Sequence, residues 1–412
     1  MTQDTAVMQA ELPANVPPDL VVDFDFYAMA GPQDDVFQAW KGFADRCRSI
    51  RGGEAPIVWT PRYGGHWIAA TGAAVEELFA DVEHLSNRSI SIPSFEGVHI
   101  LPGEGDGEEH AITRIAAIRW FTPQRVRGLA GPIRSIAAGL IEEFRDKGEC
   151  DFMPDFALKI PMHLFFEMMA LPLSDGRMLL DAAEGVIREG VAEKKIAAMQ
   201  GVFDYLGAII DDRTPNPGDD LISALILSDY KGERMPRELV LSIAVNLLMA
   251  GLDTVASMLG FVVRHLAGDD DLRRELVAHP ERIRSSVEEF ARRFPVASLG
   301  RVVAKEFSYG GVTFKLGDRL FMPTALHCLD DSVFPQATAI DIDRKLTSIM
   351  TFGRGPHQCL GALLARIELV EALGEWLGQI PEFRLTPGQP PIVSCGHITA
   401  MTSLPLSWDV PA

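Results

Sequence analysis

The loop around Cys359 constrains the fold of this chain more than any other stretch. Residues 352–361 read Phe-Gly-Arg-Gly-Pro-His-Gln-Cys-Leu-Gly, and Leu360, Leu364 and Ile367 then follow at i, i+4 and i+7. This spacing predicts an amphipathic helix that begins at or just after the cysteine. The unpaired amides of a helix N-terminus favour an ionised sulfur, and glycines let the backbone approach a flat ligand. We therefore expect a thiolate that faces a large ligand.

A second constraint is the apolar segment 239–263, which is long enough to cross a bilayer. It is interrupted by the polar residues Ser242, Asn246, Asp253, Thr254 and Ser257. No uninterrupted apolar run approaches the roughly 20 residues that a membrane span needs. The segment therefore predicts a buried central helix and no membrane span.

The rest of the chain predicts a mainly α-helical protein with small β-sheets. Residues 57–60 and 65–71, joined by Pro-Arg-Tyr-Gly at 61–64, have the pattern of a hairpin. Further strands are expected near 307–314 and within 392–406. No linker composition or repeat divides the chain, so we expect a flexible segment at 1–20 and a single domain over 21–412.

Composition narrows the class of function. The chain has 412 residues, 47% of them hydrophobic, and a net charge of −19, which suits a large globular core and argues against a nucleic-acid partner. Its five cysteines are scattered and have no zinc-site spacing, so neither a disulfide framework nor a zinc site is expected. Residues 1–18 have no basic and apolar regions of a signal peptide, and we expect a cytoplasmic protein.

The pattern Phe-x-x-Gly-x-x-x-Cys-x-Gly, followed by Ala365-Arg366, resembles the haem-binding loop of cytochromes P450. The resemblance extends over nearly the whole chain and is strongest to soluble, ferredoxin-dependent bacterial members, above all the camphor hydroxylase group, at residues 21–27, 64–69, 251–255 and 404–409. It implies the triangular P450 prism and a haem b whose iron is bound by the Cys359 thiolate. A thiolate ligand favours cleavage of the O–O bond.

Residues 250–254, Ala-Gly-Leu-Asp-Thr, resemble the oxygen-activation motif of that family. The small pair Ala250 and Gly251 would leave room for dioxygen, and the Thr254 hydroxyl would bond back to the Ala250 carbonyl and loosen the helix. The resemblance implies that Asp253 relays protons and that Thr254 acts beside the bound oxygen. By themselves, Asp253 and Thr254 could be solvent-exposed polar residues on a helix. A carboxylate in so apolar a segment, however, favours a functional role.

Anchors for the two haem propionates are also implied by the resemblance. Guanidinium groups suit carboxylates, and the His-x-x-x-Arg helix pattern occurs here. The implied anchors are His110, Arg114, Arg301 and His357.

Glu289 and Arg292 stand at i and i+3 on a predicted helix. By itself, such a pair would be an ordinary surface ion pair that contributes little to stability. In the P450 family such a pair joins an arginine from the region of Arg344 in a buried network. We therefore expect a structural clamp under the haem.

The resemblance also implies a substrate pocket, lined by Ser91, Val98, His99, Asn246, Met249, Gly251, Ala297, Leu299, His397 and Ile398. The tyrosine that binds camphor in the related group falls near Val98 or His99, and neither is tyrosine. Asn246 replaces a leucine, and Leu299 stands where an acid is expected. An apolar lining with a few polar points suits a hydrophobic ligand with one oxygen, such as a terpenoid or an ionone.

The expected activity is hydroxylation of an unactivated C–H bond with O2. The sequence shows no flavin- or nicotinamide-binding motif. The glycine-rich stretch at 103–107 does not qualify, because it is acidic and follows no predicted strand. The resemblance implies a [2Fe-2S] ferredoxin with an NADH-dependent reductase, which would dock on the cysteine side near Arg114, Lys345 and Arg366. A peroxide-driven peroxygenase and a non-catalytic haem sensor or carrier remain as alternatives.

Overall fold

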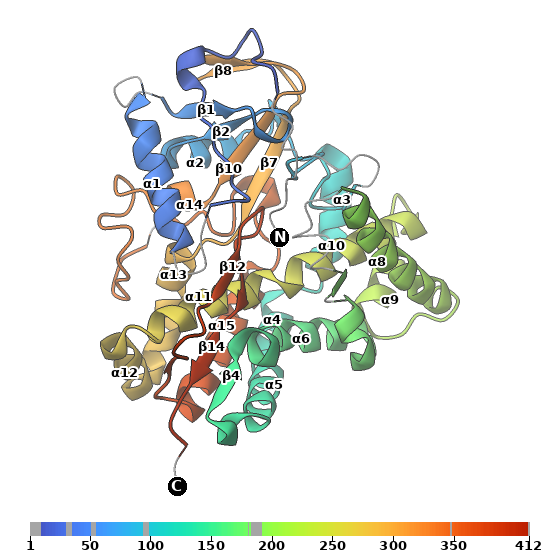
Figure 1. Ribbon diagram of the computed structural model, residues 1–412. Coiled ribbons are helices and arrows are strands. Elements are labelled where there is room, and N and C mark those ends of the chain that lie inside the picture. The colour runs from blue at the N-terminus through green and yellow to red at the C-terminus, as the bar shows by residue number, and fades with distance from the viewer. Residues whose placement is uncertain are drawn as a thin grey trace.

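The structure is a computed structural model and describes residues 10–29, 35–50, 55–93, 99–179, 181–182, 192–346 and 348–410. Val98 lies outside these residues. Helices make up most of the described chain, and the largest sheet lies at one end of the molecule with α1 (Val36–Arg48) and α2 (Gly72–Ala80) beside it (Figure 1). The expected mainly helical architecture with small sheets is therefore present.

The longer helices after α2 form the main body of the protein. They are α3 (Gly107–Ile118), α4 (Pro123–Gly128), α5 (Ala130–Glu142), α6 (Lys159–Met169), α8 (Ala192–Arg213), α9 (Leu221–Ile226), α10 (Arg237–Leu252), α11 (Thr254–Leu266), α12 (Asp270–Ala278), α13 (Ile283–Arg293), α14 (Ala325–Cys328) and α15 (Ala362–Gln379). Short 3-10 or π turns are η1 (Pro18–Leu20), η3 (Arg62–Gly64), η4 (Arg145–Lys147), η5 (Met153–Ala157), η6 (Leu173–Asp175), η7 (Pro280–Arg282) and η8 (Gly355–His357).

The largest sheet has the strand order β1-β2-β10-β7-β3. Its strands are β1 (Ile57–Thr60), β2 (His66–Ala69), β10 (Arg319–Pro323), β7 (Ser298–Val303) and β3 (Leu85–Ser86). β2 and β10 run parallel and the other neighbours are antiparallel. The expected hairpin is confirmed, because β1 pairs with β2 in the register Ile57 to Ala69.

The remaining strands form small sheets elsewhere. They are β4 (Glu149–Asp151), β5 (Asp229–Tyr230), β6 (Glu233–Arg234), β8 (Phe307–Tyr309), β9 (Val312–Phe314), β11 (Arg384–Leu385), β12 (Ile392–Ser394), β13 (Ala400–Ser403) and β14 (Pro405–Ser407). They pair as β11-β14-β4, β12-β13, β5-β6 and β8-β9. Strands were expected near 307–314 and within 392–406, and both are present.

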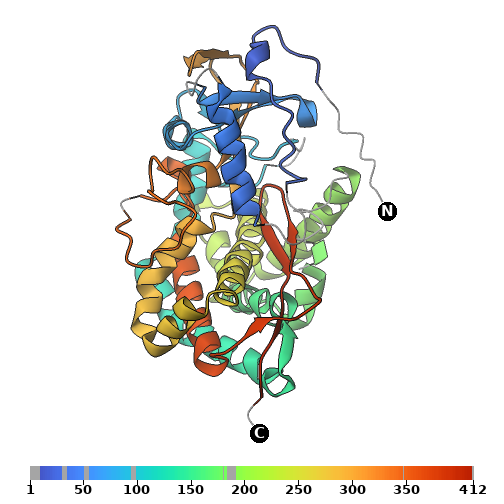
Figure 2. The same ribbon diagram turned by 60° about the vertical axis from the view of Figure 1, so that its left-hand side comes forward.

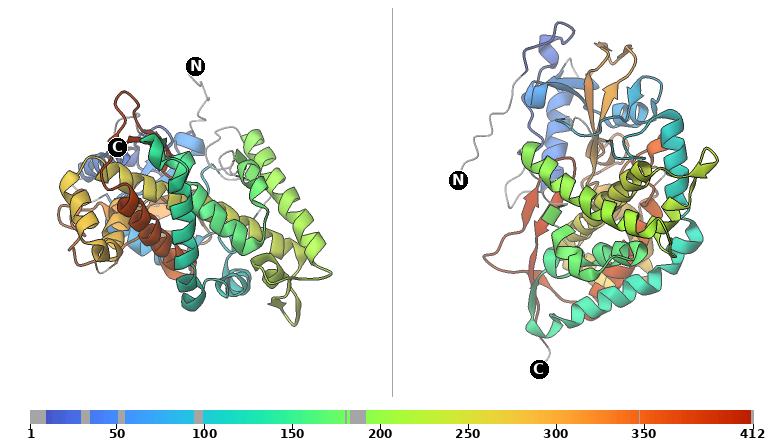
Figure 3. Two further views of the ribbon diagram at one scale, coloured as in Figure 1. Left: turned by 90° about the horizontal axis from the view of Figure 1, so that it is seen from below. Right: turned by 90° about the vertical axis from the view of Figure 1, so that its right-hand side faces the viewer.

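α10 and α11 cross the middle of the molecule (Figures 1 and 2). Residues Arg237–Leu266 are long and apolar enough to span a membrane, but 72% of the most apolar window is buried inside the protein. α8 lies across α10, and α15 packs against α5 (Figure 3). The expected central helix is confirmed, with a break at Asp253 between its two halves.

The N-terminal residues that the structure describes pack onto the sheet end. The Ala10 amide donates to the Pro61 carbonyl at 2.9 Å, and Leu20 is fully buried. The domain boundaries at 20 and 21 remain a prediction.

Candidate active site

The cysteine loop joins η8 to α15. Gly353 and Gly355 have φ values of 67° and 73°, which residues with a Cβ rarely adopt, so the loop needs glycine at both positions. The Cys359 amide donates to the Phe352 carbonyl at 2.7 Å, which closes the loop. α15 begins just after it, with Gly361 as its N-cap residue, as the apolar spacing predicted.

The sulfur of Cys359 is closely surrounded by protein although the residue as a whole is exposed. Burial therefore raises the pKa of the thiol, while the Gly361 amide and the charges of Arg114 and Arg366 lower it by smaller amounts. The amide at the helix start thus favours the ionised sulfur, as expected, while desolvation of the site opposes it. A bound metal cation reverses that balance, since a coordinating thiol is deprotonated outright.

The break between α10 and α11 has the geometry that the Ala-Gly-Leu-Asp-Thr motif predicted. The Thr254 hydroxyl donates to the Ala250 carbonyl at 3.0 Å, and the helix is interrupted at Asp253, which is only 5% exposed. A hydroxyl that bonds back one turn bends a helix. Ala250 is exposed although α10 crosses the centre of the molecule, so this face of the helix borders an internal space.

Gly251 has a packing role that the sequence did not predict. A Cβ built at this position would lie 2.2 Å from Cε2 of Phe165 on α6. The small residue is therefore needed where α10 packs against α6. Its neighbour Ala250, the other small residue of the motif, is exposed, while the place of the half-buried Gly251 in the pocket stays a prediction.

Three distant elements bring together the four expected propionate anchors. The imidazole rings of His110 on α3 and His357 in η8 lie with their centroids 3.9 Å apart. Arg114, one turn after His110, donates to the Gln358 carbonyl at 2.6 Å. Arg301 on β7 is 2% exposed and donates to the Gly300 carbonyl at 2.8 Å.

The pKa shifts in this cluster reflect burial of several cationic groups together. The pKa of His357 is lowered to about 3 by desolvation and then by His110 and Arg301. Desolvation and Arg114 also lower the pKa of His110. Burial lowers the pKa of Arg301 to about 10, and Asp106 is the carboxylate whose charge opposes this shift. Such a cluster favours negatively charged ligands.

The cluster fits the haem that the resemblance implies. Nε2 of His110 and Nδ1 of His357 are buried and have no hydrogen-bond partner among the described residues. Two imidazoles and two guanidinium groups offer donors for two carboxylates, while Cys359 supplies a sulfur ligand within the same loop as His357. Cys359 would hold the iron, and the four anchors would hold the propionates.

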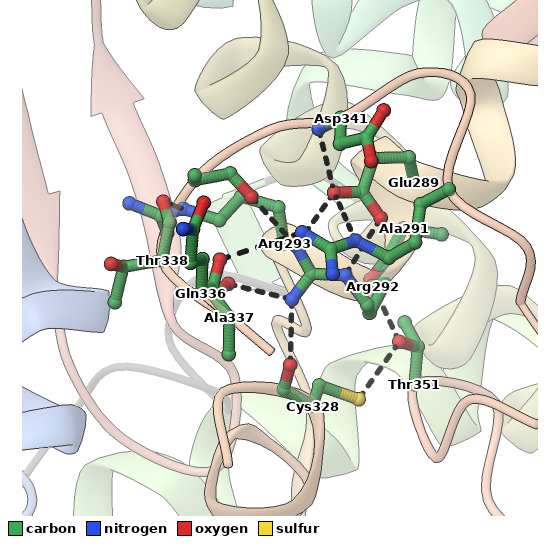
Figure 4. Close-up of polar contacts among 12 residues, drawn as sticks. Glu289, Ala291, Arg292, Arg293, Cys328, Gln336, Ala337, Thr338, Asp341 and Thr351 are labelled. Atoms are coloured by element: carbon green, nitrogen blue, oxygen red, sulfur yellow. Dashed lines mark hydrogen bonds and ion pairs between the residues drawn. The ribbon is translucent and has the colours of Figure 1, made fainter. Parts of the chain in front are cut away.

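The clamp residues form a buried network, drawn in part in Figure 4. Arg292, which is fully buried, donates from Nε and Nη2 to the two oxygens of Glu289 at 2.7 Å each, and from Nη1 to the Cys328 and Ala337 carbonyls. Nε of Arg344 donates to Glu289 at 3.2 Å. The structure thus joins α13 to the segment that leads into the cysteine loop.

The expected pocket residue His397 ties together two backbone segments, at Ile92 and at Ser298. Its Nε2 accepts from the Ile92 amide at 2.7 Å, and its Nδ1 contacts the Ser298 carbonyl at 2.9 Å. Ala297 pairs with Ile398 in an isolated bridge.

The other expected pocket residues differ in exposure. Ser91 and Leu299 are half-buried, and Met249 is 9% exposed. His99 is exposed, with its carbonyl bonded to the Ser242 hydroxyl at 2.8 Å.

Sequence reasoning missed two residues that position the loop before α3. The Ser242 hydroxyl also accepts from the Leu101 amide at 2.8 Å, and Glu104 accepts from the amides of Ile90 and Ile100. Ser242 stands one helical turn before Asn246, which was the available signal. Nothing in the sequence marked Glu104, because its partners are backbone amides of a loop.

Comparisons with known proteins show which sequences and structures this chain resembles. The cytochrome P450 family model matches residues 186–407. The protein called probable cytochrome P450 127A1, from Sinorhizobium fredii, is 30% identical over 96% of this chain and 97% of its own length. The vitamin D3 dihydroxylase of Streptomyces griseolus is 27% identical over 88% of this chain and 93% of its own length.

Two solved structures share the fold over nearly the whole chain. CYP101J2 superposes with a TM-score of 0.89 at 34% identity, and CYP101C1 with a TM-score of 0.87 at 35% identity. In each case the match covers 97% of this chain and all of the other.

Proposed function

Because this chain belongs to the cytochrome P450 family and is a haem-thiolate monooxygenase, we propose that it hydroxylates an unactivated C–H bond of a small terpenoid or norisoprenoid, such as an ionone. Electrons come from a [2Fe-2S] ferredoxin and its NADH-dependent reductase. The observation that carries the proposal is the hydrogen bond from Thr254 to the Ala250 carbonyl beside the buried Asp253. It supports a proton route into the space that this helix face borders.

When bound, haem supplies the iron on which O2 is activated, and a thiolate ligand favours O–O cleavage. Cys359 holds that iron, and the anchors His110, Arg114, Arg301 and His357 hold the propionates. Asp253 passes a proton toward the Thr254 hydroxyl, which must turn away from the Ala250 carbonyl to donate it. The broken helix turn leaves backbone groups that water can reach.

The electron donor should dock on the face that carries the cysteine loop. Arg114 is bonded to Gln358 in that loop, and Lys345 is exposed. Arg366, expected in the same basic patch, is instead paired with Glu288 through two hydrogen bonds. The remaining cations still suit an acidic ferredoxin, and such complexes are small and sensitive to salt. We further propose a single catalytic domain over 21–412 and a cytoplasmic location.

The test is turnover of the holoenzyme with β-ionone under two electron supplies. We expect hydroxylated product and NADH consumption only when ferredoxin and reductase are both present. Product formation with hydrogen peroxide alone, unaffected by ferredoxin, would establish a peroxygenase instead. Neither product nor NADH consumption with any terpenoid would favour a haem sensor or carrier.

A further inference from the structure

Four residues of the central helix follow one another at one-turn spacing along the internal space. Ser242, Asn246, Ala250 and Thr254 are each four residues apart and so share one face of the helix. Ser242 is bonded to the backbone at His99 and Thr254 to Ala250. The two ends of this line therefore have partners within the protein, and Ala250 is exposed between them.

Asn246 is the polar member of this line that has no hydrogen-bond partner among the described residues. It is half-buried, and within the described part of the chain neither its amide oxygen nor its amide nitrogen makes a hydrogen bond. The amide lies against the loop before α3, where a Cβ on Gly103 would come within 3.0 Å of its oxygen. The loop thus confines the side chain without satisfying it.

An amide in this position has a cost that an apolar residue would not have. Asparagine favours the helix less than leucine does, and the half-buried amide of Asn246 borders an otherwise apolar wall. A ligand oxygen that enters the internal space would supply the missing partner. The neighbouring wall residues Met249 and Ala250 are apolar, so the rest of that ligand should be hydrophobic.

We propose that Asn246 hydrogen-bonds an oxygen atom of the substrate, and that the substrate is an elongated hydrophobic ketone or alcohol oxidised at a carbon remote from that oxygen. The proposal rests on the proposed function. Ala250 and Thr254 lie one and two turns from Asn246, which places the reacting carbon roughly 6 to 12 Å from the anchored oxygen. That separation suits an ionone skeleton and exceeds what a compact cage such as camphor offers.

The test compares ligands that differ by a single oxygen. Binding of β-ionone and of the hydrocarbon that lacks its carbonyl oxygen is measured by the spin-state shift of the holoenzyme, in the wild type and in Asn246→Leu. We expect the wild type to prefer the ketone and the variant to bind it about 3- to 10-fold more weakly, as for loss of one neutral hydrogen bond. Binding of the hydrocarbon should stay the same or tighten.

Met249→Leu is the matched control, because it changes an apolar wall residue on the same helix. It should shift both ligands by the same factor and keep their ratio. The proposal is overturned if Asn246→Leu leaves the ratio of the two ligand affinities unchanged. If both ligands bind more weakly by the same factor, Asn246 only supports the loop at Gly103. A wild type that does not prefer β-ionone over its deoxygenated counterpart would also overturn the proposal. A wild type without a thiolate-type carbon monoxide spectrum would instead refute the proposed function, whatever Asn246 does.

Discussion

A single buried carboxyl group gives α15 a pH-dependent stability. Glu368 is 1% exposed, its Oε2 has no partner among the described residues, and burial raises its pKa to about 8. Between pH 4.5 and about pH 8, the Glu368 carboxyl group is therefore protonated in the folded protein and ionised in the unfolded chain. The stability that this proton contributes is complete below pH 4.5 and is lost as the pH rises toward 8.

Glu368→Gln should accordingly stabilise the protein in a pH-dependent way. We expect a gain in the free energy of unfolding of roughly 3 to 5 kcal/mol at pH 8 and less than about 1 kcal/mol at pH 5. Urea unfolding at the two pH values measures this, with Glu375→Gln on the same helix as the control. Equal effects at both pH values would show that the carboxyl group is ionised in the folded state.

Also at the residue scale, Thr254→Ala removes the hydroxyl that the proton route needs. The variant should bind haem and substrate as the wild type does. The product formed per NADH should fall several-fold, and the remaining electrons should reduce O2 to hydrogen peroxide. Parallel assays of product, NADH and peroxide measure this. Coupling equal to that of the wild type would remove Thr254 from the proton route.

At the scale of elements, the contact between α10 and α6 depends on Gly251. Gly251→Ala places a methyl group against Phe165 and should destabilise the protein by about 1 to 3 kcal/mol. Gly374→Ala on α15 meets no atom within 4 Å and should stabilise it by about 0.5 to 1 kcal/mol. Thermal unfolding of both variants measures these two opposite changes in stability. A Gly251→Ala variant as stable as the wild type would show that the contact between α10 and α6 does not need glycine at this position.

The elements also show what sequence could predict. The hairpin at 57–69, the central helix and the helix after Cys359 follow from local spacing and turn residues, so they were predicted. The role of Gly251 was not, because it depends on Phe165, a side chain far away in the sequence. The desolvation that raises the pKa of the Cys359 thiol was not predicted either, because it depends on the protein packed around the loop and not on local spacing.

At the scale of the whole molecule, the clamp connects α13 to the segment before the cysteine loop. Glu289→Gln weakens the partner of the fully buried Arg292 and should cost about 3 to 5 kcal/mol, as for an uncompensated buried charge. Glu288→Gln, which breaks the half-buried pair with Arg366, should cost only about 1 kcal/mol, because both side chains remain in contact with water. Chemical unfolding of both variants tests this difference, and similar losses would contradict the account.

The central claim is that Cys359 is the thiolate ligand of a haem. The reduced carbon monoxide spectrum tests it most directly, with Cys359→Ala and Cys359→His beside the wild type and Cys395→Ser as a control thiol variant. We predict a thiolate-type Soret band in the wild type and in Cys395→Ser, its loss in Cys359→Ala, and a displaced band in Cys359→His. A thiolate-type band that persists in either Cys359 variant would contradict the account.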